Sequence, residues 1–246
     1  MAKAPIPPRS GLARALSKLG FCSRTQAFSL IRSGRVQLNQ RVVREPETPV
    51  RLDKDRIQVD GKDIDPAGKV YLMLNKPRGL VTTRSDEKGR KTIYSLLQGY
   101  SDWLAPVGRL DMASEGLLLL TNDSAWGASI SAPEGQITKI YHVQIDALAG
   151  QELVDRLCQG VRSDDGGFLR ANRARILRLG KKNSWLEIVL DQGKNRHIRR
   201  MLSALGIEVL RLVRVAIGPV ELGQLPKGNT RPLTNQEKEA LTEKKY

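Results

Sequence analysis

Cysteine and histidine are scarce in this sequence of 246 residues, which contains two of each. Cys22 and Cys158 lie far apart in the chain, so we expect no disulfide framework and infer a reducing compartment. Neither the cysteines nor His142 and His197 show metal-ligand spacing, and we therefore expect no metal. A phosphate-cradling loop, a dinucleotide fingerprint and a nucleophile elbow are also missing, which argues against the common nucleotide-dependent and serine-hydrolase classes.

Long hydrophobic runs are missing too. No apolar stretch approaches the roughly 20 residues that a membrane span requires. The first eight residues, Met1 to Pro8, lack the apolar stretch of a secretory signal. We therefore expect a cytoplasmic protein with no membrane partner. The hydrophobic fraction of 40% is nevertheless enough for a packed core.

Acidic residues are absent before Glu45, although the whole chain carries 26 of them against 41 lysines and arginines. The formal charge of +15 indicates a polyanionic partner, most often nucleic acid, and the alternative is a solvated surface without a partner. The cations that we expect to bind RNA in this first segment are Arg14, Lys18, Arg24, Arg32 and Arg35.

Helical spacing shows that this basic segment is folded. Leucines and alanines over residues 12–19 predict a helix that ends at Gly20, and Ser23 with Gln26 predicts a capping box for a second helix that ends at Gly34. A strand over residues 36–38 should follow, with a polar turn at residues 39–40. The pattern predicts a compact helix–helix–strand unit over residues 10–66.

A composition shift around residues 61–69 indicates a linker, and residues 69–240 predict a second, larger α+β domain. The fold class that we expect is α+β, with a mixed, mainly antiparallel sheet flanked by helices and a small N-terminal α/β domain. Strands are predicted within 70–74, 117–120, 137–145, 185–190 and 209–217, and helices within 92–98, 124–131, 150–159, 195–205 and 234–243, the last with a Thr234/Glu237 capping box.

Asp111 stands in a basic turn bounded by Gly108 and followed by the apolar residues 117–120. Spacing alone leaves two interpretations open for this carboxylate. It could be a structural turn acceptor or ion-pair partner, or it could be a catalytic group.

Two resemblances favour the catalytic interpretation. Residues 11–64, with the run from Leu19 to Asn39, resemble the alpha-L RNA-binding domain first described in a ribosomal small-subunit protein. Residues 70–240 resemble the RsuA-like family of ribosomal RNA pseudouridine synthases. The segments that carry this second resemblance are Asn75–Gly79 with Thr82-Thr83, Gly108–Asp111 with Glu115–Asp123, Lys139–Val143, and Gly193–Leu202.

The second resemblance implies an enzyme that isomerises a specific uridine in ribosomal RNA to pseudouridine by base flipping, without a cofactor. Asp111 matches the essential aspartate, Tyr141 the aromatic residue that stacks on the uracil, and Arg199 the basic partner that keeps the carboxylate ionised. Arg109 resembles the side chain that takes the place of the flipped base. Further contacts with RNA are expected from Lys194, Arg196 and Arg200, and Arg211 and Arg214 should extend the positive surface.

Gln192 and His197 depart from the residues common in that family and put the target in doubt, not the reaction. One alternative is a ribosome-associated RNA-binding protein that has lost turnover, and another is a transfer RNA modifier of the same chemistry. Residues 86–92 favour large-subunit RNA, free or in a pre-ribosomal particle. We expect a monomer.

Overall fold

The structure is a computed structural model that describes residues 10–84, 86–100, 103–132 and 137–243. These residues form two compact units. The first holds residues 10–71 with the described parts of 99–105 and residues 121–127, and the second holds the rest. The predicted boundary between residues 66 and 69 stays a prediction, because two later segments group with the first unit. None of the described helices is long and apolar enough to cross a membrane.

The N-terminal unit contains the predicted pair of helices. Ser23 caps the second helix through its side chain, and Gln26 completes the capping box, as the sequence predicts. Its small sheet has the order β3-β2-β5-β6. The turn at Asn39-Gln40 has positive φ at both residues, which suits a tight hairpin. Its elements are β1 (Ser10–Gly11), α1 (Leu12–Lys18), α2 (Arg24–Arg32), β2 (Val36–Leu38), β3 (Arg41–Val42), β4 (Pro49–Val50), β5 (Ile57–Val59) and β6 (Lys62–Asp63).

The larger unit is built on a mixed sheet with the order β13-β14-β10-β15-β9-β7-β17. Most neighbours are antiparallel, and β9 and β15 form a parallel pair. This arrangement confirms the α+β prediction. The strands are β7 (Tyr71–Lys76), β8 (Ala105–Val107), β9 (Glu115–Thr121), β10 (Lys139–Ile145), β11 (Val161–Arg162), β12 (Phe168–Leu169), β13 (Arg173–Leu179), β14 (Ser184–Leu190), β15 (Val209–Ile217), β16 (Val220–Glu221) and β17 (Thr230–Pro232).

The helices of this unit follow the predicted segments, with one exception. The segment 92–98 forms only a 3₁₀ turn, η1 (Ile93–Leu96). Thr92 accepts a hydrogen bond from the Tyr94 backbone, and Ser95 donates to the Thr92 carbonyl; such local bonds compete with a regular helix. The other helices are α3 (Ser124–Ser131), α4 (Gln151–Gln159), α5 (His197–Ser203) and α6 (Asn235–Ala240), and the Thr234/Glu237 capping box is confirmed.

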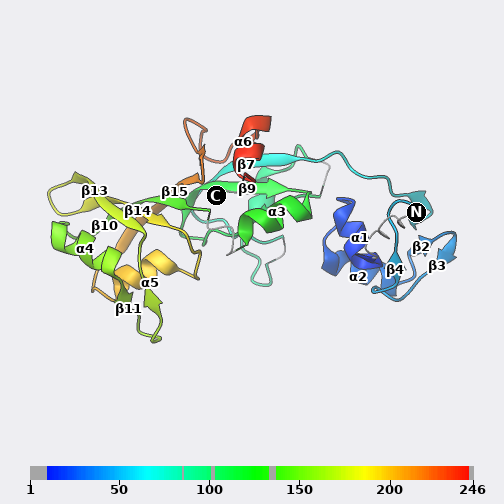
Figure 1. The fold of residues 1–246 in the computed structure, drawn as a ribbon, viewed down its shortest axis with the longest axis horizontal. Helices are drawn as coiled ribbons and strands as arrows, with labels where there is room; N and C mark the ends of the chain where they lie inside the picture. The colour runs from blue at the N-terminus through cyan, green and yellow to red at the C-terminus, as the bar shows by residue number, and fades with distance from the viewer. Residues whose placement is uncertain (1–9, 85, 101–102, 133–136, 244–246) are drawn as a thin grey trace, which may run out of the picture. The chain divides into compact units, whose positions relative to one another are not determined.

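Helices α4 and α5 cover one face of the strands β10, β13, β14 and β15 (Figure 1). Leu157 from α4 and Met201 from α5 are fully buried there, against Val143 and Leu186 of the sheet. Because each strand turns alternate side chains to this core, the intervening side chains lie on the opposite face.

Candidate active site

Asp111 lies in the loop between β8 and β9. Gly108 opens this loop with a φ of 74°, a conformation that few other residues adopt without strain. The loop ends where the Ser114 backbone N–H donates to the Asp111 carbonyl at 3.0 Å. Asp111 is half-buried, and among the residues that the structure describes its carboxylate has no hydrogen bond or ion pair.

The loop backbone, in contrast, is bonded at every carbonyl from Leu110 to Ser114. Thr82 donates its hydroxyl to the Leu110 carbonyl at 2.7 Å, and the Gly79 N–H donates to the Met112 carbonyl at 2.8 Å. The donors to the remaining carbonyls, at Asp111, Ala113 and Ser114, are the side chains of Lys76 and Arg199. A backbone fixed at five consecutive carbonyls holds the Asp111 Cα in one place and leaves its carboxylate available.

Lys76 is the central donor of this set. Its ammonium group is fully buried and donates to the carbonyls of Pro77 at 3.1 Å, Asp111 at 3.1 Å and Ser114 at 2.9 Å. Burial lowers the pKa of Lys76 to about 8, although the nearby carboxylates of Asp111 and Glu115 oppose this shift. The segment 75–83, which the sequence singled out as a motif, is therefore the support of the Asp111 loop.

Asp111 faces a pocket of about 620 Å³ that lies within the larger unit. Tyr141 of β10 lines the same pocket, half-buried, with its neighbours Ile188 and Arg214 on either side in the sheet. The pocket wall is rich in positive charge and holds one further carboxylate, Asp191. Its basic residues are Arg109, Lys139, Lys194, Arg196 and Arg214.

Arg199 does not form the predicted ion pair with Asp111 in the described part of the chain. Its guanidinium donates instead to the carbonyls of Ala113 at 3.1 Å and Val209 at 3.2 Å. Burial lowers the pKa of Arg199, the neighbouring Arg196 adds to the shift, and Asp111 opposes it. Arg199 therefore acts on Asp111 through the loop backbone and through its charge at longer range, and its catalytic role stays a prediction.

The predicted RNA contacts near the pocket fall into two groups. Arg109, Lys194 and Arg196 are exposed and line the pocket. Arg200 instead donates hydrogen bonds to the Asp165 carboxylate and to the Ser163 hydroxyl. Hydrogen bonds from the Ser163 hydroxyl, Arg200 and the Gly167 N–H lower the pKa of Asp165 to about 2. A phosphate would have to displace the Asp165 carboxylate to reach Arg200.

Arg211 and Arg214, which were predicted to extend the positive surface, are both engaged by other groups of the protein. Arg214 is only 5% exposed and donates to the Leu117 carbonyl at 2.7 Å, so it belongs to the pocket wall. Arg211 binds the buried carboxylate of Glu115, with its Nε 2.8 Å from Oε1. Strand alternation could have indicated the burial of Arg214, since Leu212 and Ala216 on the same face are buried.

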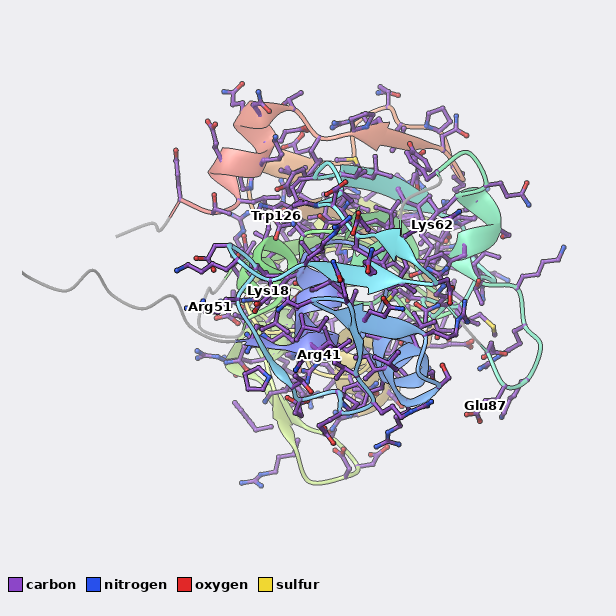
Figure 2. All side chains as sticks on the ribbon, turned by 90° about the vertical axis from the view of Figure 1, so that its right-hand side faces the viewer. Lys18, Arg41, Arg51, Lys62, Glu87 and Trp126 are labelled. Carbon is purple, nitrogen blue, oxygen red and sulfur yellow. The ribbon has the colours of Figure 1, made fainter. Side chains whose placement is uncertain are left out.

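The predicted cations of the N-terminal unit are mostly available to solvent. Arg14, Arg24 and Arg32 are exposed, and Lys18 is half-buried at the end of α1. Arg35 forms a salt bridge with Asp60. Figure 2 labels Lys18 with three further basic side chains of this unit: Arg41, Arg51 and Lys62.

The sequence assigned no role to Lys139, although this residue begins the segment Lys139–Val143 that resembles the family. Its ammonium group lines the pocket, and burial together with the nearby Arg214 lowers its pKa. The signal was its position two residues before Tyr141, which puts both side chains on the same face of β10. Among the described residues, no cluster of three His, Cys, Asp or Glu could hold a metal ion.

Comparison with known proteins identifies the family of this chain. Residues 70–204 match the RNA pseudouridylate synthase family, and residues 11–57 match the S4 domain. A pseudouridylate synthase of known crystal structure superposes with a TM-score of 0.65 at 28% identity, covering 94% of this chain and 99% of that one.

Two curated relatives match almost end to end. An uncharacterised RNA pseudouridine synthase of Aquifex aeolicus is 40% identical over 224 residues, 90% of this chain and 89% of the relative. The ribosomal large subunit pseudouridine synthase B of Bacillus subtilis is 34% identical over 232 residues, 94% of each. The chain belongs to the RNA pseudouridine synthase family and carries an N-terminal S4 RNA-binding domain.

Proposed function

We propose that this enzyme isomerises one specific uridine of ribosomal RNA to pseudouridine, with Asp111 as the catalytic carboxylate and no cofactor. The observation that carries the proposal is the Asp111 carboxylate, which no described residue engages, on a loop whose backbone is bonded at five consecutive carbonyls. This carboxylate faces a pocket that also presents Tyr141. Such preorganisation is what a catalytic group requires, and a structural turn acceptor would have its carboxylate occupied.

The reaction needs no oxidant or reductant. The bond between uracil N1 and ribose C1′ breaks, the base turns, and C5 bonds to C1′. C5 then loses its proton and N1 gains one, so product and substrate have the same composition. Asp111 serves as an ionised carboxylate in either proposed route, attack on the base or sugar, or removal of a sugar proton.

The surrounding residues suit a flipped nucleotide. The ring of Tyr141 offers a face for the uracil after it leaves its helix. Arg109, exposed at the pocket edge, can fill the space that the base leaves, because a planar guanidinium stacks as well as pairs with phosphate. Lys139 and Arg214 add positive charge to the wall of the pocket that Asp111 also lines.

Ribosomal RNA is the proposed target class, and large-subunit RNA within it. The relative from Bacillus subtilis is named for the large subunit, and the match to it spans 94% of this chain. The S4 domain and the exposed arginines of the N-terminal unit supply a second RNA contact. We propose that the enzyme acts as a cytoplasmic monomer.

The test is an Asp111→Asn variant assayed by pseudouridine mapping of ribosomal RNA. We expect modification to fall by several orders of magnitude while RNA affinity is retained, because the amide keeps the shape and loses the charge. Asp164→Asn, an exposed carboxylate in the β11–β12 hairpin, is the matched control and should modify normally. If the Asp111 variant modified RNA as well as the wild type, the proposal would be wrong. If the wild type bound RNA and left every uridine unchanged, the chain would be a non-catalytic RNA-binding protein.

A further inference from the structure

The outer strand β13 and the hairpin after it form a strongly basic segment away from the pocket. Residues 166–186 contain no acidic residue. Its cations are Arg170, Arg173, Arg175, Arg178, Lys181 and Lys182. None of the residues 166–186 lines the pocket, so the active site does not account for this segment.

Three of these arginines share the face of the sheet opposite α4 and α5. Ala174 and Ile176 of β13 belong to the helix-covered core, and Arg173 and Arg175 alternate with them. After a bulge between Ile176 and Arg178, Arg178 lies beside Trp185 of β14 on that same opposite face. Figure 1 shows α4 and α5 on one side of these strands only. The side chains of Arg173 and Arg175 are 67% and 61% exposed.

A nearly buried carboxylate holds one of these arginines and lies close to a second. Glu187 of β14, 10% exposed, receives two hydrogen bonds from Arg175, at 2.7 and 2.9 Å, and lies 3.8 Å from Arg173. The hydrogen bond and charge of Arg175 lower the pKa of Glu187, although burial opposes the shift. One negative charge is thus shared by two permanent cations, and the cluster keeps a net positive charge. Because Arg175 is already held by two hydrogen bonds, its contact with a phosphate would cost little further side-chain entropy.

Charged side chains on an outer strand can also serve only to prevent pairing with another sheet. That role requires a charge of either sign and does not require the charge to be held by a buried partner. The uniform positive sign, the hydrogen-bonded Arg175 and the exposure of these side chains together fit a polyanion better.

We propose that the β13 face, formed by Arg173, Arg175, Arg178, Lys181 and Lys182, binds the phosphate backbone of a structured RNA outside the catalytic pocket. The inference rests on the proposed function only in taking ribosomal RNA as the probe. Trp185 is partly covered by Arg211, whose guanidinium lies 5.8 Å from the ring centre, so base stacking is not part of the contact. The contact is therefore electrostatic and independent of base sequence.

The test is the salt dependence of binding to a full-length large-subunit ribosomal RNA transcript. In an Arg173→Gln/Arg178→Gln variant, Arg175 still pairs with Glu187, so the fold is preserved, which a thermal melt checks. If each arginine contacts one phosphate, the slope of log K against log salt should become less negative by about 1.4–1.8, since each phosphate contact contributes roughly 0.7 on single strands and 0.9 on duplex DNA. The matched control, Arg156→Gln/Lys238→Gln on α4 and α6, removes two charges elsewhere and should leave the slope unchanged.

Pseudouridine formation at saturating RNA separates this surface from the active site. The β13 variant should keep the wild-type rate once RNA is saturating, because the pocket is intact. An unchanged slope would overturn the proposal, and so would binding that is lost for intact ribosomal particles but kept for naked RNA, which would indicate an acidic protein partner. A wild type that shows the expected slopes but makes no pseudouridine would refute the proposed function and leave this inference standing.

Discussion

Lys76 and Asp111 divide the work of the site between backbone and side chain. Lys76 donates its N–H groups to three carbonyls around the loop. The Asp111 carboxylate, in contrast, forms no hydrogen bond with the described residues. An ammonium group without access to water is costly in free energy, which is why its pKa falls. The cost is consistent with a position kept for function and not for stability.

The lowered pKa of Lys76 makes a testable stability prediction. Below about pH 8 the amine is protonated in both states. Above it, the folded state releases the proton, and the unfolded state retains it up to the ordinary pKa of 10.5, so the unfolded state binds more protons and stability rises with pH. Between pH 7.5 and 9.5 the wild type should gain about 2 kcal/mol relative to a Lys76→Met variant, measured by urea unfolding. Parallel pH profiles for the two proteins would contradict the burial of a charged amine.

The sequence predicted which residues belong to the site better than it predicted the groups to which they bond. Motif matching selected Asp111, Tyr141 and Arg199. It could not show that the Arg199 guanidinium bonds to the Ala113 and Val209 carbonyls, because those partners lie in segments far from it in sequence. The salt bridge between Arg200 and Asp165 could not be predicted for the same reason.

Among the elements, the parallel pair β9 and β15 depends on a glycine. Gly116 has a φ of 100°, and a Cβ built there would lie 2.2 Å from the Arg214 carbonyl oxygen. Glu115 and Gly116 are the residues through which β9 pairs with β15. The close approach of the two backbones therefore leaves no room for a side chain at residue 116.

A Gly116→Ala variant should accordingly lose several kcal/mol of stability and most of its activity, since β9 begins directly after the Asp111 loop. Gly79→Ala is the matched control: its φ of 93° is similarly unfavourable for alanine, but nothing lies within 4 Å of the new Cβ. We expect a cost of about 1–2 kcal/mol there. Urea unfolding of both variants measures the difference. Equal losses would show that backbone conformation, and not the contact with β15, decides the cost.

The sequence predicted helices and strands whose apolar residues recur at regular spacing, and it missed several elements that lack such spacing. β15 has the predicted bounds, Val209–Ile217, and α4 begins one residue later than predicted. β13 was missed because its bulge between Ile176 and Arg178 interrupts the alternation and because arginine fills its open face. Strands of two or three residues, such as β8 and β17, are set by pairing partners distant in sequence, and no local pattern announces them.

For the whole molecule, the core of the N-terminal unit is drawn from residues 12–59, with partly buried neighbours as far as Ile64. A fragment of residues 10–66 should therefore fold alone, with a stability of only about 3–5 kcal/mol because its core is small. Dispersed amide signals in an NMR spectrum and a cooperative thermal melt would support the predicted domain boundary. A fragment that stays unfolded would place the boundary later, since the segments 99–105 and 121–127 group with this unit.

The pairing of β7 with β17 also has a consequence for synthesis on the ribosome. Leu72 and Leu74, in the first strand of the larger sheet, pair with Pro232 and Thr230 in its last strand. The nascent chain thus exposes this edge of β7 until residues 230–232 have left the exit tunnel, and long-range pairing of this kind is slow. The larger sheet therefore becomes complete only after β17 has been synthesised. Until then, the unpaired edge of β7 is open to pairing with strands of other chains.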